Sequence, residues 1–249
     1  MNFIRSIQSE LIKTRRSSAA WLALAGGFFI PVIFTIVSLH EGKTLDQEPL
    51  GAWQNHFMNL WRSMASFLLP MGIILASSLI TQMEYKNNTW KQLITTPQSL
   101  TQIFFSKFTV ILIMTIKFFL YFNIGILFSG IIPSLIIDGQ FPEASFPIKI
   151  FLSQNGLIFI TCLPILAVQY LNSILLKNYM APIGIGLLML IGTLIGAPWK
   201  HIYISPYSYC FLKITPFPIT FNLYVYALIY FSVIMALCYY LFLNKKEKG

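Results

Sequence analysis

The chain has 249 residues, of which 56% are hydrophobic and only 10% are charged, and its mean hydropathy is +0.70. Soluble domains carry about 25% charged residues, so this composition excludes an ordinary soluble domain. The net charge of +9 would suggest nucleic acid in a soluble protein. In a membrane protein it reflects Lys and Arg retained in cytoplasmic loops. We therefore expect an all-α polytopic membrane protein that contacts the lipid bilayer and no nucleic acid.

Residues 1–17 precede the first apolar run and predict a short interfacial helix. Phe3, Ile7 and Leu11 recur at helical spacing, and basic residues lie between and after them. A helix of this kind lies on the inner leaflet, where anionic lipid attracts its positive charge. The alternative is a basic flank without a helix.

Six apolar stretches are long enough to cross about 30 Å of hydrocarbon as helices. They occupy residues 18–39, 64–82, 103–132, 150–176, 179–197 and 221–243. The first is too long for a removable signal core and is expected to remain as an anchor. The third requires tilt or a cytoplasmic extension. The fifth is short and rich in Gly, which favours close helix packing.

We treat residues 1–249 as a single transmembrane domain, in which residues 18–197 hold the first five spans and 244–249 form a tail. Eleven Lys and Arg lie on the side of the N-terminus and five on the other side. The positive-inside rule then places both termini in the cytoplasm. The expected location is a membrane that the chain crosses several times.

Two outer segments are rich in aromatic residues. Residues 198–220 are too polar and too rich in Pro to span, so we expect a broken, interfacial or re-entrant element before the last span. In the first outer loop, Trp53, Phe57 and Trp61 recur every four residues. We interpret this spacing as a second interfacial pattern.

Between the second and third spans, a short segment predicts an amphipathic cytoplasmic helix. Trp90, Leu93, Ile94 and Pro97 recur at i, i+3, i+4 and i+7, so they share one helical face. That face needs a surface to cover. Periodicity alone leaves both the membrane interface and a soluble partner protein open.

Two signals compete for the start of the third span. Thr96 before Pro97 resembles an N-cap followed by Pro at the first helical position. Ser99 with Gln102 is a potential capping box. Either signal ends the cytoplasmic helix and begins the span.

The sequence has none of the common catalytic motifs. It contains no G-x-x-x-x-G-K-[ST], no H-E-x-x-H and no G-x-S-x-G, and no acid falls in the middle of a predicted span. Cys162, Cys210 and Cys238 show no metal or redox spacing. We therefore expect no enzyme activity and no bound metal or cofactor in this chain.

Lys117 is the one charged residue inside a predicted span. It lies about 15 Å along the helix from Lys107, near the bilayer midplane, where a charge costs about 2.5 kcal/mol or more. It is a candidate for lining a translocation path. The rival is a structural contact to Asn123, Tyr121 or backbone oxygens.

The loop after the second span resembles the cytoplasmic segment of type-2 ABC exporter permeases. The matching residues are, in chain order, Glu84, Thr89, Trp90, Lys91, Thr96, Pro97, Ser99 and Lys107. The opening run 9–17, followed by Trp21, is similar to the start of the lantibiotic-immunity permeases of that class. The six-span layout and the broken element before the last span also resemble the class.

The resemblance implies a permease subunit of an ATP-driven exporter, working with a second permease subunit that is identical or related. ATP and Mg²⁺ would bind to a separate ABC ATPase, into which the loop helix docks. The residues assigned to that contact are Glu84, Trp90, Lys91, Leu93 and Ile94. The cargo would be an antimicrobial peptide or another amphipathic compound. The alternative is a non-transporting anchor or assembly factor that recruits a soluble partner through the same helix.

Overall fold

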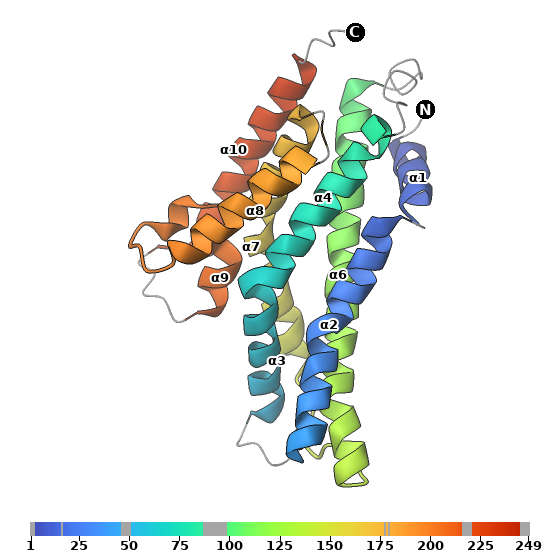
Figure 1. Ribbon diagram of the computed structural model, residues 1–249, viewed down its shortest axis with the longest axis vertical. Helices are drawn as coiled ribbons and strands as arrows, with labels where there is room; N and C mark the ends of the chain where they lie inside the picture. The colour runs from blue at the N-terminus through green and yellow to red at the C-terminus, as the bar shows by residue number, and fades with distance from the viewer. Residues whose placement is uncertain are drawn as a thin grey trace.

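The computed structural model confirms the all-α class (Figure 1). It describes residues 3–15, 17–45, 51–86, 99–176, 178, 180–215 and 221–244. The elements within these ranges are α1 (Phe3–Thr14), α2 (Ser18–Glu41), α3 (Ala52–Ser63), the π-helical turn η2 (Met64–Leu68), α4 (Leu69–Lys86), α6 (Leu100–Ile137), α7 (Ile148–Leu175), α8 (Met180–Ile195), the 3₁₀ turn η3 (Ile202–Ile204), α9 (Tyr209–Ile214) and α10 (Leu223–Leu243).

Five helices of the described residues are long and apolar enough to cross a membrane. They are Ser18–Glu41, Ala52–Met83, Leu100–Ile137, Ile148–Leu175 and Leu223–Leu243. The fifth predicted span forms the shorter apolar helix α8, which has 16 residues. Helix α6 has 38 residues and extends beyond the predicted third span at both of its ends.

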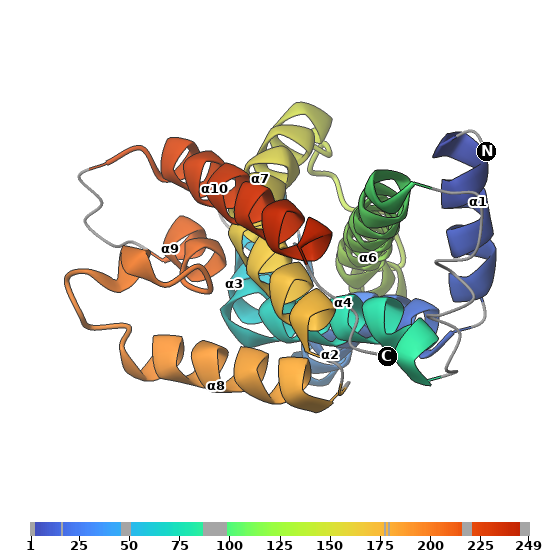
Figure 2. The ribbon, with the colours of Figure 1, turned by 90° about the horizontal axis from the view of Figure 1, so that it is seen from above.

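The long helices form one bundle with α6 as its longest member (Figures 1 and 2). Helix α2 packs along α6, α10 packs along α7, and α4 contacts both α7 and α8. The start of α1 and the end of α10 lie at one end of the bundle, which we call the terminal end (Figure 1). The opposite end, where α2 and α6 end and α3 begins, is the far end (Figure 1).

Two glycines allow α2 and α6 to approach closely. A Cβ atom on Gly125 of α6 would lie 2.7 Å from Cγ of Pro31 in α2, and one on Gly27 of α2 would lie 2.8 Å from Cβ of Tyr121. Without a hydrophobic driving force between apolar helices, van der Waals contact at small residues holds them together in a bilayer. Gly125 and Gly27 thus set the spacing of the longest helix pair.

The interfacial interpretation of Trp53, Phe57 and Trp61 is wrong. These side chains are only 5%, 1% and 0% exposed, because α3 continues through η2 into α4 and packs against α6 and α7. The Trp53 Nε1–H donates to the Ala144 carbonyl oxygen at 2.9 Å. A spacing of four residues marks one helical face, and it does not distinguish a protein core from a headgroup zone.

The segment after α8 is broken, as predicted, into η3 and α9. Trp199 is exposed, whereas Tyr207 and Tyr209 are buried. Helix α9 packs against α3, η2 and α7. In η2 the Leu69 N–H donates to the Met64 carbonyl, five residues earlier, which is the hydrogen-bond pattern of a π turn. The part of the second span that α9 contacts is therefore a π turn.

Replacing Gly125 with Ala is expected to destabilise the protein by about 1–3 kcal/mol, because the new methyl group has no room beside Pro31. The matched control is Gly156→Ala on α7, where a Cβ atom meets nothing within 4 Å. Melting temperatures in detergent compare the two variants. Equal melting temperatures would contradict the close packing of α2 on α6.

Candidate functional site

The predicted ATPase-docking residues lie at the terminal end of the bundle or outside the described residues. Glu84 belongs to the last turn of α4, and its side chain is outside the description. Trp90, Lys91, Leu93 and Ile94 fall in residues 87–98, which are also outside it. Their docking role remains a prediction.

The boundary after this loop is described, and it favours one of the two capping signals. The Gln102 N–H donates to Ser99 Oγ at 3.2 Å, and the Ser99 N–H donates to Gln102 Oε1 at 3.4 Å. These reciprocal bonds form the capping box and satisfy N–H groups that helix geometry leaves unpaired. Helix α6 therefore begins at a defined point directly after the candidate docking loop.

Helix α1 is fastened to this end of α6 by a buried ion pair. Lys107 Nζ donates to Glu10 Oε2 at 3.2 Å, and Lys13 Nζ donates to Glu10 Oε1 at 2.6 Å. The side chains of Lys107 and Glu10 are only 2% and 6% exposed. The predicted N-terminal helix is present, but the face it turns to the bundle carries Ser6, Glu10 and Thr14.

The charge on Glu10 is stabilised by its two lysine partners. Burial alone would raise the pKa of this carboxyl, but the nearby charges of Lys107 and Lys13 and their hydrogen bonds outweigh burial, and the pKa is lowered. Separating the pair would leave a buried charge without compensation, which is far more costly than losing an exposed ion pair. The contact therefore fixes the position of α1 relative to α6.

Lys117 lies on the exposed side of α6. Its neighbours Ile116 and Leu120 are 54% and 56% exposed. Within the described part of the chain its ammonium group forms no hydrogen bond or ion pair. The amide of Asn123 is engaged elsewhere, since it exchanges hydrogen bonds of 2.8 and 2.7 Å with Asn155 of α7.

Sequence reasoning missed a buried polar network that joins α4, α7, α8 and the segment before α9. Gln169 Nε2 donates to Ser78 Oγ at 3.0 Å and to the Pro182 carbonyl at 2.9 Å. The Tyr207 hydroxyl donates to Gln169 Oε1 at 3.1 Å. A Cβ atom on Gly186 would lie 2.7 Å from the same Oε1, so a glycine is needed there. The available signal was a glutamine within the apolar run 150–176.

Gln82 is a second part of this polar interior. Its Nε2 donates to the carbonyls of Ser173 and Leu176, each at 2.7 Å. Leu176 is the residue at which α7 ends, so the amide satisfies carbonyl groups that the helix itself leaves unpaired. These bonds tie α4 to the end of α7 on the side of the termini and make the bundle one unit.

Replacing Glu10 with Gln is expected to cost about 3–5 kcal/mol, because Lys107 stays buried without its counter-charge. The lowered pKa of Glu10 means that its contribution is present above the ordinary value of 4.5 and is lost as the pH falls below it. As the pH falls below 4.5, the melting temperature should therefore decrease less for Glu10→Gln than for the wild type. Lys13→Met, at a 41% exposed side chain, is the control and should cost about 1 kcal/mol or less. Identical acid profiles would contradict this account.

A comparison with known families matches the chain to one model. No curated protein matches it at a significant level. The matching model is described as ABC-2 family transporter protein, and it covers residues 6–193, from α1 into α8. The match extends over most of the chain and includes the candidate docking loop, the Glu10–Lys107 pair and Lys117. The protein belongs to the ABC-2 transporter family, whose members are membrane permease subunits of ABC transporters.

Proposed function

We propose that this chain is the permease subunit of an ATP-driven exporter that is energised by a separate ABC ATPase. The observation that carries the proposal is the family match over residues 6–193. The sequence itself holds no phosphate-binding loop, so ATP and Mg²⁺ would bind to the partner. The similarity of the N-terminal region to lantibiotic-immunity permeases supports a cationic antimicrobial peptide, or another amphipathic compound, as cargo.

The proposed orientation places the terminal end in the cytoplasm of a bacterial cell, where an ATPase could reach residues 87–98. It is supported by eleven Lys and Arg on that side against five on the other. A second permease subunit, identical or related, is the other proposed partner. Helices α2 and α10 leave many large apolar side chains exposed, which only lipid or another subunit can cover.

For the ATPase contact, the double substitution Trp90→Ala with Leu93→Ala is expected to abolish copurification of the ATPase with tagged permease. Removing large apolar anchors from an interface costs about 2 kcal/mol or more for each. Trp199→Ala, at an exposed residue outside the loop, is the control and should leave copurification unchanged. Undiminished copurification of the double variant would assign the loop helix to the membrane surface.

Lys117 is the residue that we propose lines the translocation path. An ammonium group on an exposed helix face near the bilayer midplane requires water, cargo or another subunit to solvate it. The eight acids of the sequence all lie outside the middle of the spanning helices. The partner of Lys117 therefore comes from outside the single chain, as expected for a residue that faces a hydrated path between two permease subunits.

Lys117→Met is expected to leave the melting temperature unchanged or raised, because the desolvation cost of the charge disappears. Protection of cells against cationic antimicrobial peptides should fall, while the ATPase still copurifies. Lys149→Met, at an exposed lysine in the first turn of α7, is the control and should keep full protection. A stable Lys117→Met variant with full protection would rule out the path role.

A further inference from the structure

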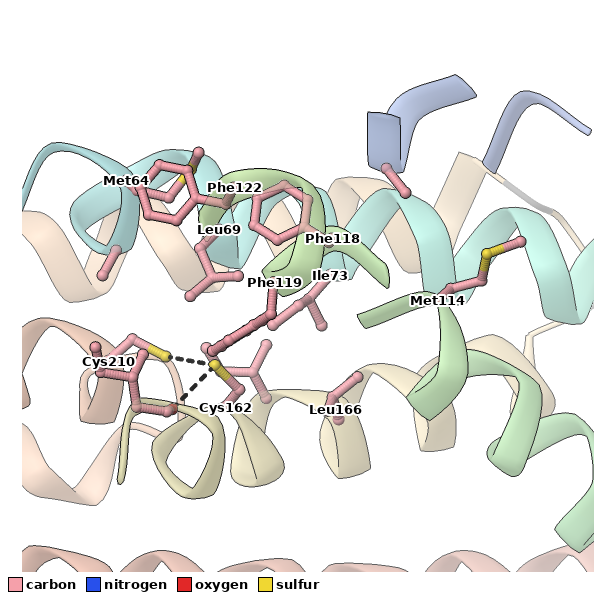
Figure 3. Close-up of a cluster of buried hydrophobic side chains, with 14 of the residues drawn as sticks. Met64, Leu69, Ile73, Met114, Phe118, Phe119, Phe122, Cys162, Leu166 and Cys210 are labelled. Atoms are coloured by element: carbon pink, nitrogen blue, oxygen red, sulfur yellow. Dashed lines mark hydrogen bonds between the residues drawn. The ribbon is translucent and has the colours of Figure 1, made fainter. Parts of the chain in front are cut away.

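Two cysteines that are far apart in the sequence meet in the centre of the bundle. Cys162 lies on α7 and Cys210 on α9, and their Sγ atoms are 3.4 Å apart. Both side chains are 0% exposed, and both are free thiols in this structure. Figure 3 shows the two sulfur atoms pointing toward each other beside the apolar cluster that includes Phe119 and Leu69.

The surrounding contacts hold the two sulfurs in this position. The Cys162 thiol also lies 3.3 Å from the Ile158 carbonyl, and the Cys210 thiol lies 3.5 Å from the Thr161 carbonyl. The Thr161 hydroxyl points to the same carbonyl of Ile158 at 2.7 Å and approaches Cys210 Sγ at 3.9 Å. These contacts with one turn of α7 thus place the Cys210 thiol of α9 next to the Cys162 thiol.

A covalent bond at this point would stabilise the position of the short helix α9. It has six residues, and a helix of that length is not stable without tertiary contacts. A bond from Cys210 to Cys162 would fix α9 against α7 and so keep it packed on η2 and α3.

We propose that Cys162 and Cys210 form a disulfide bond in the mature protein. In the reaction the two thiols lose two protons and two electrons, one Sγ–Sγ bond forms, and the S–S bond of a disulfide oxidant is cleaved to two thiols. Bonded sulfurs lie about 2.05 Å apart, so the two Sγ atoms, now 3.4 Å apart, must approach by a little over 1 Å for the bond to form. Because both sulfurs are inaccessible in the folded bundle, oxidation precedes the packing of α9, on the outer side of the membrane in the proposed orientation.

The test counts free thiols in full-length protein from cells quenched with acid and alkylated with N-ethylmaleimide under denaturing conditions. The chain has three cysteines, so the disulfide form carries one alkyl group, on Cys238, and three after reduction. The buried bond should also resist an impermeant phosphine until the protein is unfolded. Peptide mapping should recover the peptides of Cys162 and Cys210 as one linked species.

Cysteine variants make the count unambiguous. Cys238→Ser should carry no alkyl group before reduction, whereas Cys162→Ser and Cys210→Ser should each carry two. Three alkyl groups on the unreduced wild type, or a linked peptide that contains Cys238, would overturn the proposal. The count requires neither ATPase nor cargo, so it is decided independently of the proposed transport.

Discussion

Inside a bilayer, a polar side chain finds partners only in protein or trapped water, and this constraint accounts for the specific contacts of the bundle. The amide of Gln169 joins α7 to α4, α8 and the segment before α9, and the amide of Gln82 donates to carbonyl groups at the end of α7. Asn123 and Asn155 satisfy each other across α6 and α7. Apolar contact alone would let these helices slide, because lipid tails are as apolar as the helix faces. The amide bonds fix their register.

The overall class and the approximate places of the apolar helices could be predicted from the sequence because length and hydropathy are local properties of the chain. The start of the second span at Ala52, rather than at residue 64, could not. The burial of Trp53, Phe57 and Trp61 could not, since helical spacing defines a face without naming what covers it. The predicted fifth span was short and rich in glycine, and it forms the short helix α8. Only the fold shows that Gly186 makes room for Gln169.

Contacts between distant residues were the other limit. Glu10 and Lys107 each belong to a sequence motif, but nothing in either motif says that one side chain binds the other. Cys162 and Cys210 carry no recognisable spacing because α8 and the broken segment separate them. Periodicity predicts an amphipathic helix in the loop before α6, but residues 87–98 lie outside the described part of the chain, so the helix and its docking role remain predictions. The structure does describe the helices on either side of this loop, which are α4 before it and the capped start of α6 after it.

The π turn between α3 and α4 changes what the second span can do mechanically. A π turn holds one residue more than the α-helical ladder requires. If that extra residue were passed along the helix, the half on one side of the π turn would rotate by about 100° about its own axis while the other half stayed in place. Because α9 packs against η2, such a rotation would first change the contacts of α9. The second span is therefore not one uninterrupted α-helix, because the π turn η2 separates α3 from α4.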